Sequence, residues 1–145
     1  MATIKSFTSL EQSKKLAEIL PLESADMVYI KHSSSDNPTW EFNEDFPPMI
    51  LGNVPINEMT VEALPCWSLV ALLKLMPKHI LRKDKIHYGQ TFIPSFRWEI
   101  SPTAIYYTDG NNIMDYVSFR YGENNIELID AVFKMAVWLK EKGLL

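Results

Sequence analysis

Acidic side chains and a histidine gather in one loop-like stretch of the sequence. His32 precedes a run of serines, and Asp36 and Glu41 follow it, with further acids just beyond. General acid–base catalysis needs two titratable groups held in different environments. If the protein is a small enzyme, these three residues are therefore the candidates. The alternative, which the loop-like composition favours, is a solvated acidic loop without catalysis.

Cys66 is the only cysteine of the chain. It lies just before an expected helix, where unpaired N–H groups lower the pKa of a thiol, but its apolar neighbours favour a buried, unreactive thiol. His32, His79 and His87 show no metal-binding spacing, and no glycine-rich phosphate loop is present. We therefore assign no catalytic residue, no metal ligand and no cofactor, and lean against an enzyme.

A basic, partly aromatic segment spans residues 78–88 and includes Arg82 and Lys83. Such a segment can contact phosphate groups by electrostatic attraction. The pI of the chain is about 5.3, whereas nucleic-acid-binding domains usually have a high pI. We expect a solvated connector and keep weak nucleic-acid binding through this segment as an alternative.

Aromatic residues are the more unusual feature, with seven Phe, four Trp and six Tyr. Tyr, Trp and Arg are enriched where protein interfaces concentrate their binding energy. Tyr106 and Tyr107 are neighbours on an expected strand, so they point to opposite faces. One of them is expected on the wet face of a sheet with Arg97 or Arg120. The candidate binding residues are therefore Arg97, Tyr106 and Arg120, with Arg82 and Lys83 as a second set.

The helices that must position these residues follow from apolar periodicity and stop signals. They are expected at Leu10–Leu20, Ser68–Met76 and Ile126–Lys142, with a short helical turn at Thr60–Leu64. Ser9 with Gln12, and Asn124 with Glu127, have the spacing of a capping box at the first and last helix.

The expected strands alternate apolar and polar residues. They cover Met27–Lys31, Trp40–Asn43, residues 86–93, Phe96–Ile100, Thr103–Thr108 and Asp115–Tyr121, with Asp45–Pro55 as an edge strand or extended loop. The pattern predicts an α+β fold in which about three helices pack on one face of an antiparallel meander.

Length and composition fit a single domain over residues 1–145. Hydrophobic residues make up 47% and charged residues 22%, close to globular averages. No apolar run approaches the ~20 residues of a membrane helix, and the N-terminal residues do not resemble a secretory signal. We expect a cytoplasmic protein that does not contact a membrane.

The net charge of −4 is unevenly distributed. Residues 18–62 carry nine acids and one base, a net charge of −8, whereas residues 63–85 carry five bases and one acid, a net charge of +4. Surface charge of both signs is normal within one domain, so internal neutralisation is the favoured interpretation. An interaction signature is the alternative.

Three blocks of sequence resemble a known family. They are Leu10–Met27, Cys66–Pro77 and Asp130–Leu145, and they are similar to small uncharacterised proteins of gut Bacteroidetes genomes and their phages or other mobile elements. The resemblance implies a cytoplasmic accessory role and carries over no site residue. Together with the segregated charge and the aromatic content, it favours a small non-enzymatic interaction module whose expected partner is a protein.

Overall fold

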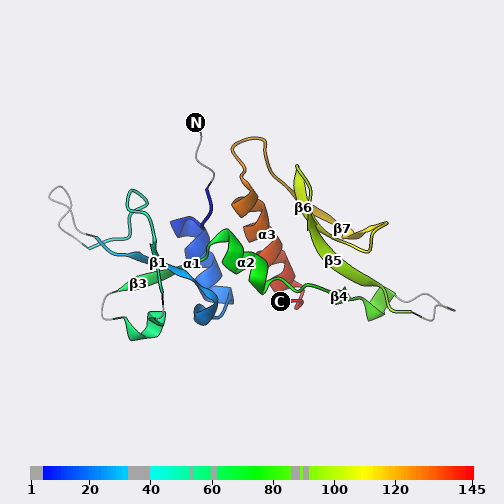
Figure 1. Ribbon diagram of the computed structural model, residues 1–145, viewed down its shortest axis with the longest axis horizontal. Helices are drawn as coiled ribbons and strands as arrows, with labels where there is room; N and C mark the ends of the chain where they lie inside the picture. The colour runs from blue at the N-terminus through cyan, green and yellow to red at the C-terminus, as the bar shows by residue number, and fades with distance from the viewer. Residues whose placement is uncertain (1–4, 33–39, 53, 60–61, 86–88, 90–91) are drawn as a thin grey trace. The chain divides into compact units, whose positions relative to one another are not determined.

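The computed structural model describes residues 5–32, 40–52, 54–59, 62–85, 89 and 92–145. They form two compact units, Met1–Leu73 and Lys74–Leu145; the α-helices and most strands are labelled in Figure 1. The described residues contain three α-helices and two antiparallel sheets. This confirms the predicted α+β class, with the strands divided between two sheets. That the whole chain forms a single domain stays a prediction.

The first unit begins with α1 (Leu10–Ile19), which has the predicted capping box. The Ser9 hydroxyl accepts the N–H of Gln12 at 3.1 Å, and the Gln12 side chain accepts the N–H of Ser9 at 3.0 Å. Pro21 follows the helix and prevents its continuation. Residues close to its two ends therefore determine where this helix starts and stops.

A three-stranded sheet completes the first unit, in the order β2-β1-β3. Its strands are β1 (Met27–Ile30), β2 (Met49–Ile50) and β3 (Ala63–Cys66). β2 is the short edge strand expected from the prolines around it. The helical turn expected at Thr60–Leu64 is wrong in its described part, because Ala63 and Leu64 pair with Ile30 and Tyr29 of β1. Thr60 and Val61 lie outside the described residues.

The core of the first unit combines apolar side chains with a small polar network. α1 packs on β3, and the Thr8 and Ser13 hydroxyls, both fully buried, lie 2.8 Å apart. The Thr8 hydroxyl also accepts the N–H of Trp67 at 3.1 Å. Tyr29 Oη donates to the Thr8 carbonyl at 2.8 Å. Each of these buried polar groups therefore has a partner, as a stable core requires.

The second unit contains a four-stranded meander in the order β4-β5-β6-β7. Its strands are β4 (Ile80–Leu81), β5 (Ser95–Ile100), β6 (Ala104–Thr108) and β7 (Ile113–Arg120). The meander confirms the three strands predicted after Phe96. β4 replaces part of the expected connector, because Ile80 pairs with Phe96. The strand expected at residues 86–93 falls mainly outside the described residues.

α3 (Leu128–Glu141) packs on β6 and β7. It begins two residues later than predicted, with Glu127 as N-cap, and the Asp130 carboxylate accepts the Glu127 N–H at 2.9 Å. The cap expected at Asn124 is therefore wrong. Asn124 and Asn125 both have left-handed backbone angles, which asparagine tolerates and which an N-cap does not have.

A bulge interrupts β7. The pairing register shifts between Tyr106 and Thr108, and Asp115 and Tyr116 have φ angles of 53° and 57°. A bulge inserts extra residues on one strand and bends it. The Tyr116 side chain is consequently 95% exposed.

The remaining elements are short. α2 (Leu69–Leu75) spans the boundary between the units, and its first turn follows Ser68, whose hydroxyl accepts the Ala71 N–H at 3.1 Å. Among the residues that the structure describes, 3-10 helices cover Leu22–Ser24 (η1), Ile56–Glu58 (η2) and Lys83–Lys85 (η3). Within the described ranges, none of the helices has the length and apolar character needed to cross a membrane.

Candidate contact surface

The register of the second sheet brings three predicted residues to one face. Glu99 and Ser118 lie on either side of Tyr106 as direct cross-strand partners. Arg97 lies opposite Thr108 and Arg120 opposite Ala104, so the two arginines are diagonal neighbours of Tyr106 on the same face. We call Arg97, Glu99, Tyr106, Ser118 and Arg120 the open face. The register therefore places Tyr106 on one face with both Arg97 and Arg120, and binding through these residues stays a prediction.

The opposite face of this sheet is core. Ile105 and Tyr107 are buried on the side that α3 covers. Tyr107 Oη donates to the Pro77 carbonyl at 2.7 Å, and burial raises the pKa of this phenol above its ordinary value. Of the two adjacent tyrosines, only Tyr106 is therefore available at the open face.

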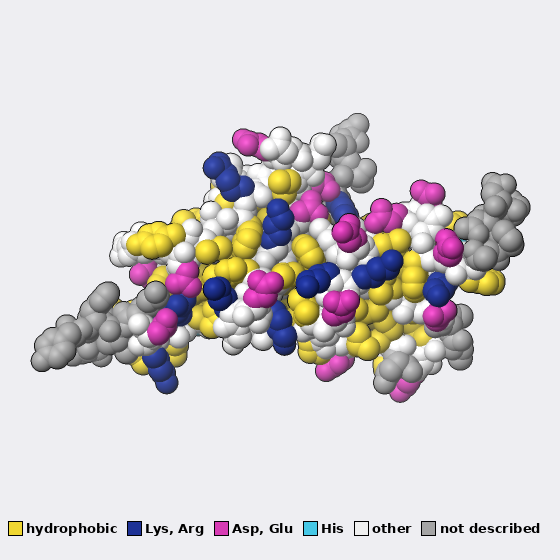
Figure 2. Space-filling model, turned by 180° about the vertical axis from the view of Figure 1, so that it is seen from behind, with side chains coloured by type: hydrophobic (Ala, Val, Ile, Leu, Met, Phe, Trp, Pro, Cys, Tyr) yellow, Lys and Arg dark blue, Asp and Glu magenta, His cyan; other side chains and the backbone are white. Residues whose placement is uncertain are grey.

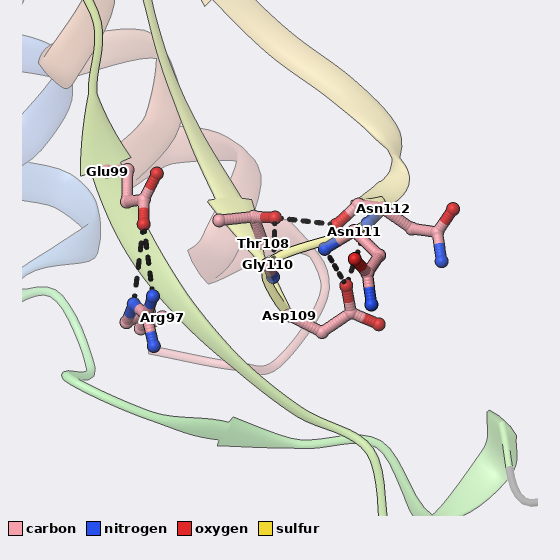
Figure 3. A network of polar contacts seen from close by, with 7 residues as sticks. All are labelled: Arg97, Glu99, Thr108, Asp109, Gly110, Asn111 and Asn112. Atoms are coloured by element: carbon pink, nitrogen blue, oxygen red, sulfur yellow. Dashed lines mark hydrogen bonds and ion pairs between the residues drawn. The ribbon is translucent and has the colours of Figure 1, made fainter.

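Charge on the open face is partly neutralised. Arg97 Nη2 lies 3.4 Å from Glu99 Oε1, and the Arg97 side chain is 60% exposed; Figure 3 shows the pair on β5. Arg120 is exposed, and no acidic partner for it is found within the described part of the chain. The open face therefore carries one unneutralised positive charge.

Arg120 also borders a hollow of about 300 Å³. The hollow lies between the β5–β6 turn and the loop before α3, and Thr103, Tyr121 and Ile126 contribute to its walls. Tyr121 N donates to the Thr103 carbonyl at 3.0 Å and fixes this end of β7. A group bound to Arg120 would therefore have a recess beside it.

The turn between β6 and β7 holds the other end of the face. The Asp109 carboxylate accepts the N–H groups of Asn111 and Asn112 at 2.8 and 2.7 Å, as Figure 3 shows. These hydrogen bonds lower the pKa of Asp109. The Thr108 hydroxyl accepts the N–H of Gly110, whose φ of 103° favours glycine. The turn predicted from Asp109-Gly110 is thus built by its own side chains.

The second set of candidates is divided by the structure. Arg82 makes a two-pronged ion pair with Asp84, at 2.9 and 2.7 Å, and a further ion pair with Asp115 at 2.8 Å. Its side chain is 12% exposed. Lys83 is exposed. Arg82 is therefore a structural residue, and Lys83 remains the accessible cation of the pair.

The acidic-loop candidates are only partly described. His32 and Glu41 form an isolated antiparallel bridge through their backbones instead of the strand expected at Trp40–Asn43. The His32 ring stacks on Phe46 with 4.2 Å between ring centres. Asp36 lies outside the described residues. A catalytic role of these three residues stays an untested alternative.

Cys66 lies inside the first unit and is fully buried. Burial raises the pKa of its thiol, and hydrogen bonding with Thr8 acts in the opposite direction. The buried, protonated thiol is the environment of a structural cysteine. This agrees with the interpretation of Cys66 as an unreactive core residue.

Charge is divided between the units. The first unit carries ten acidic and four basic residues, a net charge of −6, and the second carries eight acidic and ten basic residues, a net charge of +2. On the face shown in Figure 2, hydrophobic side chains reach the surface between charged ones. The acid-rich range 18–62 lies wholly in the first unit. All bases of the range 63–85 lie in the second.

Comparisons with known proteins give no relative from which residues could be carried over. No family model, no curated protein and no solved structure matches the chain. Within the described ranges, His, Cys, Asp and Glu form no group of three or more suited to a metal ion. The candidate surface therefore rests on its own geometry.

Sequence reasoning missed two features of these surfaces. One is the bulge at Asp115 and Tyr116, whose residue types carry no bulge signal. The other is a groove in the first unit between η1 and the β2–η2 segment. Its lining residues Ile50 and Val54 are exposed. They belong to the proline-rich stretch Asp45–Pro55, for which the sequence predicts only an edge strand or extended loop and no groove.

Proposed function

We propose that this protein is a small non-enzymatic interaction module that binds a partner protein through the open face of its second sheet. One observation carries the proposal: Arg97, Tyr106 and Arg120 share one face of β5, β6 and β7, while α3 packs on the sheet. Tyrosine and arginine are the residue types that most often dominate binding energy at interfaces.

The charges of the open face indicate the chemistry of the partner. Glu99 forms an ion pair with Arg97, which leaves Arg120 to meet an acidic group on the side of the open face, since Glu123 also lines the hollow beside it. Tyr106 is half-buried and offers an apolar ring with a polar tip. A partner surface with a carboxylate next to apolar groups complements this arrangement.

The resemblance to proteins of gut Bacteroidetes genomes and their phages supports a cellular setting for the proposal. It favours an accessory protein of a phage or mobile element that works in the cytoplasm. A host or phage protein is then the expected partner.

Affinity capture from cell lysate with mass spectrometry tests the proposal. The wild-type chain should retain a protein that Arg120→Glu and Tyr106→Ala both lose. Lys134→Glu is the matched control, because it changes the same charge at an exposed position of α3 and should retain the partner. Recovery of no protein, or equal recovery by all variants, would contradict the proposal. Loss of the partner after nuclease treatment would show that nucleic acid is bound instead.

A further inference from the structure

A groove in the first unit offers a second surface, separate from the open face. It has a volume of about 570 Å³ and lies between η1 on one side and the β2–η2 segment on the other. β2 is the edge strand of its sheet. Ile50 of this edge strand is therefore part of the groove lining.

Aliphatic side chains reach into water around this groove. Leu22 is 42% exposed, Ile50 81% and Val54 51%, and all three line it. Single exposed aliphatic residues are common, but several around one hollow indicate a binding surface.

The charges at the groove have a single sign. The two ionisable side chains among its described lining residues are Glu23 and Asp26. Asp26 accepts the Ser68 N–H at 2.8 Å, whereas Glu23 is exposed. The surrounding unit has a net charge of −6. An occupant that brings positive charge is favoured, and an acidic one is repelled.

The backbone of β2 indicates the conformation of the occupant. Leu51 N donates to the Asp26 carbonyl at 3.0 Å. Along an antiparallel pair, the residue next to a hydrogen-bonded one directs its N–H and C=O to the other side. The backbone groups of Ile50 therefore point away from β1, where an extended segment can pair with them.

We propose that this groove binds an extended segment of a partner protein in which a basic side chain lies next to apolar ones. The apolar side chains cover Leu22, Ile50 and Val54, and the basic side chain pairs with Glu23. Backbone pairing with Ile50 holds the segment beside β2. This surface does not depend on the open face.

Fluorescence anisotropy with synthetic peptides tests the proposal on the full chain. The probe is a labelled peptide of about eight residues that alternates lysine with leucine. The wild-type chain should bind it, and should bind glutamate–leucine and lysine–serine versions at least about tenfold more weakly. Equal binding of the glutamate–leucine peptide would overturn the proposal.

Matched variants separate the groove from general attraction to an acidic protein. Glu23→Lys and Ile50→Ser should each weaken binding of the lysine–leucine peptide about tenfold. Glu18→Lys and Val70→Ser change a glutamate and a β-branched aliphatic residue at exposed positions outside the groove and should leave binding nearly unchanged. Equal losses in the groove and control variants would overturn the proposal. Because Ile50 and Glu23 are exposed, these variants should fold, which circular dichroism checks.

Analytical ultracentrifugation of the chain alone tests whether a second copy of the chain, instead of a partner segment, occupies the groove. The wild-type chain should sediment in the same state as Ile50→Ser. A dimer that Ile50→Ser dissociates would show that a second copy covers the groove, which would overturn the assignment to a partner segment.

Discussion

Arg82 Nη1 lies 2.8 Å from Asp115 Oδ2 and links the end of β4 to β7, which is not a neighbour of β4 in the second sheet. Arg82 directly follows β4, and Asp115 belongs to the bulge of β7 at the opposite end of the strand order. The carboxylate of Asp115, a bulge residue, therefore contacts a residue at the beginning of the meander. The ion pair therefore connects the two ends of the strand order, which no backbone pairing between strands connects in the described residues.

Removal of this guanidinium should destabilise the second unit. We expect Arg82→Ala to lower the free energy of unfolding by about 1–3 kcal/mol, because it leaves charge-assisted hydrogen bonds unmade. Lys83→Ala is the neighbouring control and should change it by less than about 0.5 kcal/mol. Urea denaturation followed by tryptophan fluorescence measures both. Equal effects would show that the ion pairs of Arg82 contribute no stability.

The same contrast guides tests of nucleic-acid binding. Arg82 forms ion pairs with Asp84 and Asp115. Loss of nucleic-acid binding in Arg82→Ala could therefore result from a lost phosphate contact or from a destabilised second unit. Lys83→Ala avoids this difficulty, since Lys83 is exposed.

The Tyr29 hydroxyl should matter for folding of the first unit. Tyr29→Phe removes its hydrogen bond to the Thr8 carbonyl and should lower the free energy of unfolding by about 1–2 kcal/mol. Tyr116→Phe makes the same chemical change at a side chain that is 95% exposed and should have almost no effect. Thermal denaturation of the two variants in parallel gives the comparison.

Cys66 should resist modification until the first unit opens. Its thiol is buried and has a pKa raised above the ordinary 9.0, so the thiolate that reacts with Ellman's reagent is scarce. Labelling at pH 8 should be slow in buffer and rapid in denaturing urea. Fast labelling of the native chain would contradict the buried position.

The sign of the associated pH effect follows from the same burial. A thiol whose folded-state pKa is raised stabilises the folded chain below the unfolded pKa, and that contribution is lost as pH rises through the folded pKa. The phenols of Tyr29 and Tyr107 are shifted in the same direction. The free energy of unfolding should therefore decline above about pH 9.

The β6–β7 turn should respond to acid. The pKa of Asp109 is lowered by the N–H groups of Asn111 and Asn112, so its contribution is present above the unfolded pKa and is lost as pH falls through the folded pKa. The amide resonances of Asn111 and Asn112 should shift together below about pH 4 in NMR spectra. Asp109→Ala should abolish this titration. Amides that titrate in the variant as in the wild type would point to another carboxylate.

Local signals explain which elements the sequence predicts well. α1 is bounded by Ser9, Gln12 and Pro21, all within hydrogen-bonding or steric reach of its ends, so its limits can be read from neighbours in the chain. The N-terminus of α3 offers two rival signals. Asn124 has the residue type of an N-cap, but its left-handed backbone places it in the preceding loop, and Glu127 takes the cap.

Distant pairing explains what the sequence does not predict. Ala63–Cys66 forms strand β3 because it pairs with β1. No residue type within β3 predicts this pairing. The groove near Ile50 likewise forms from η1 and β2, which are separated in the sequence by residues 25–48. The open face could be predicted only in part. Alternation along each strand shows which residues share a face with Arg97 in β5 and with Tyr106 in β6, but only the pairing register shows that both residues lie on the same face of the sheet.

The bulge of β7 also affects how copies of this protein meet at high concentration. β7 is an edge strand, and edges with a long regular ladder act as templates for fibril growth. The left-handed residues Asp115 and Tyr116 interrupt the ladder, so the regular run that remains is Val117–Arg120, ending in a charge. A kinked and charged edge of this length is a poor template, so we expect the second sheet to resist open-ended aggregation without a proline in the strand.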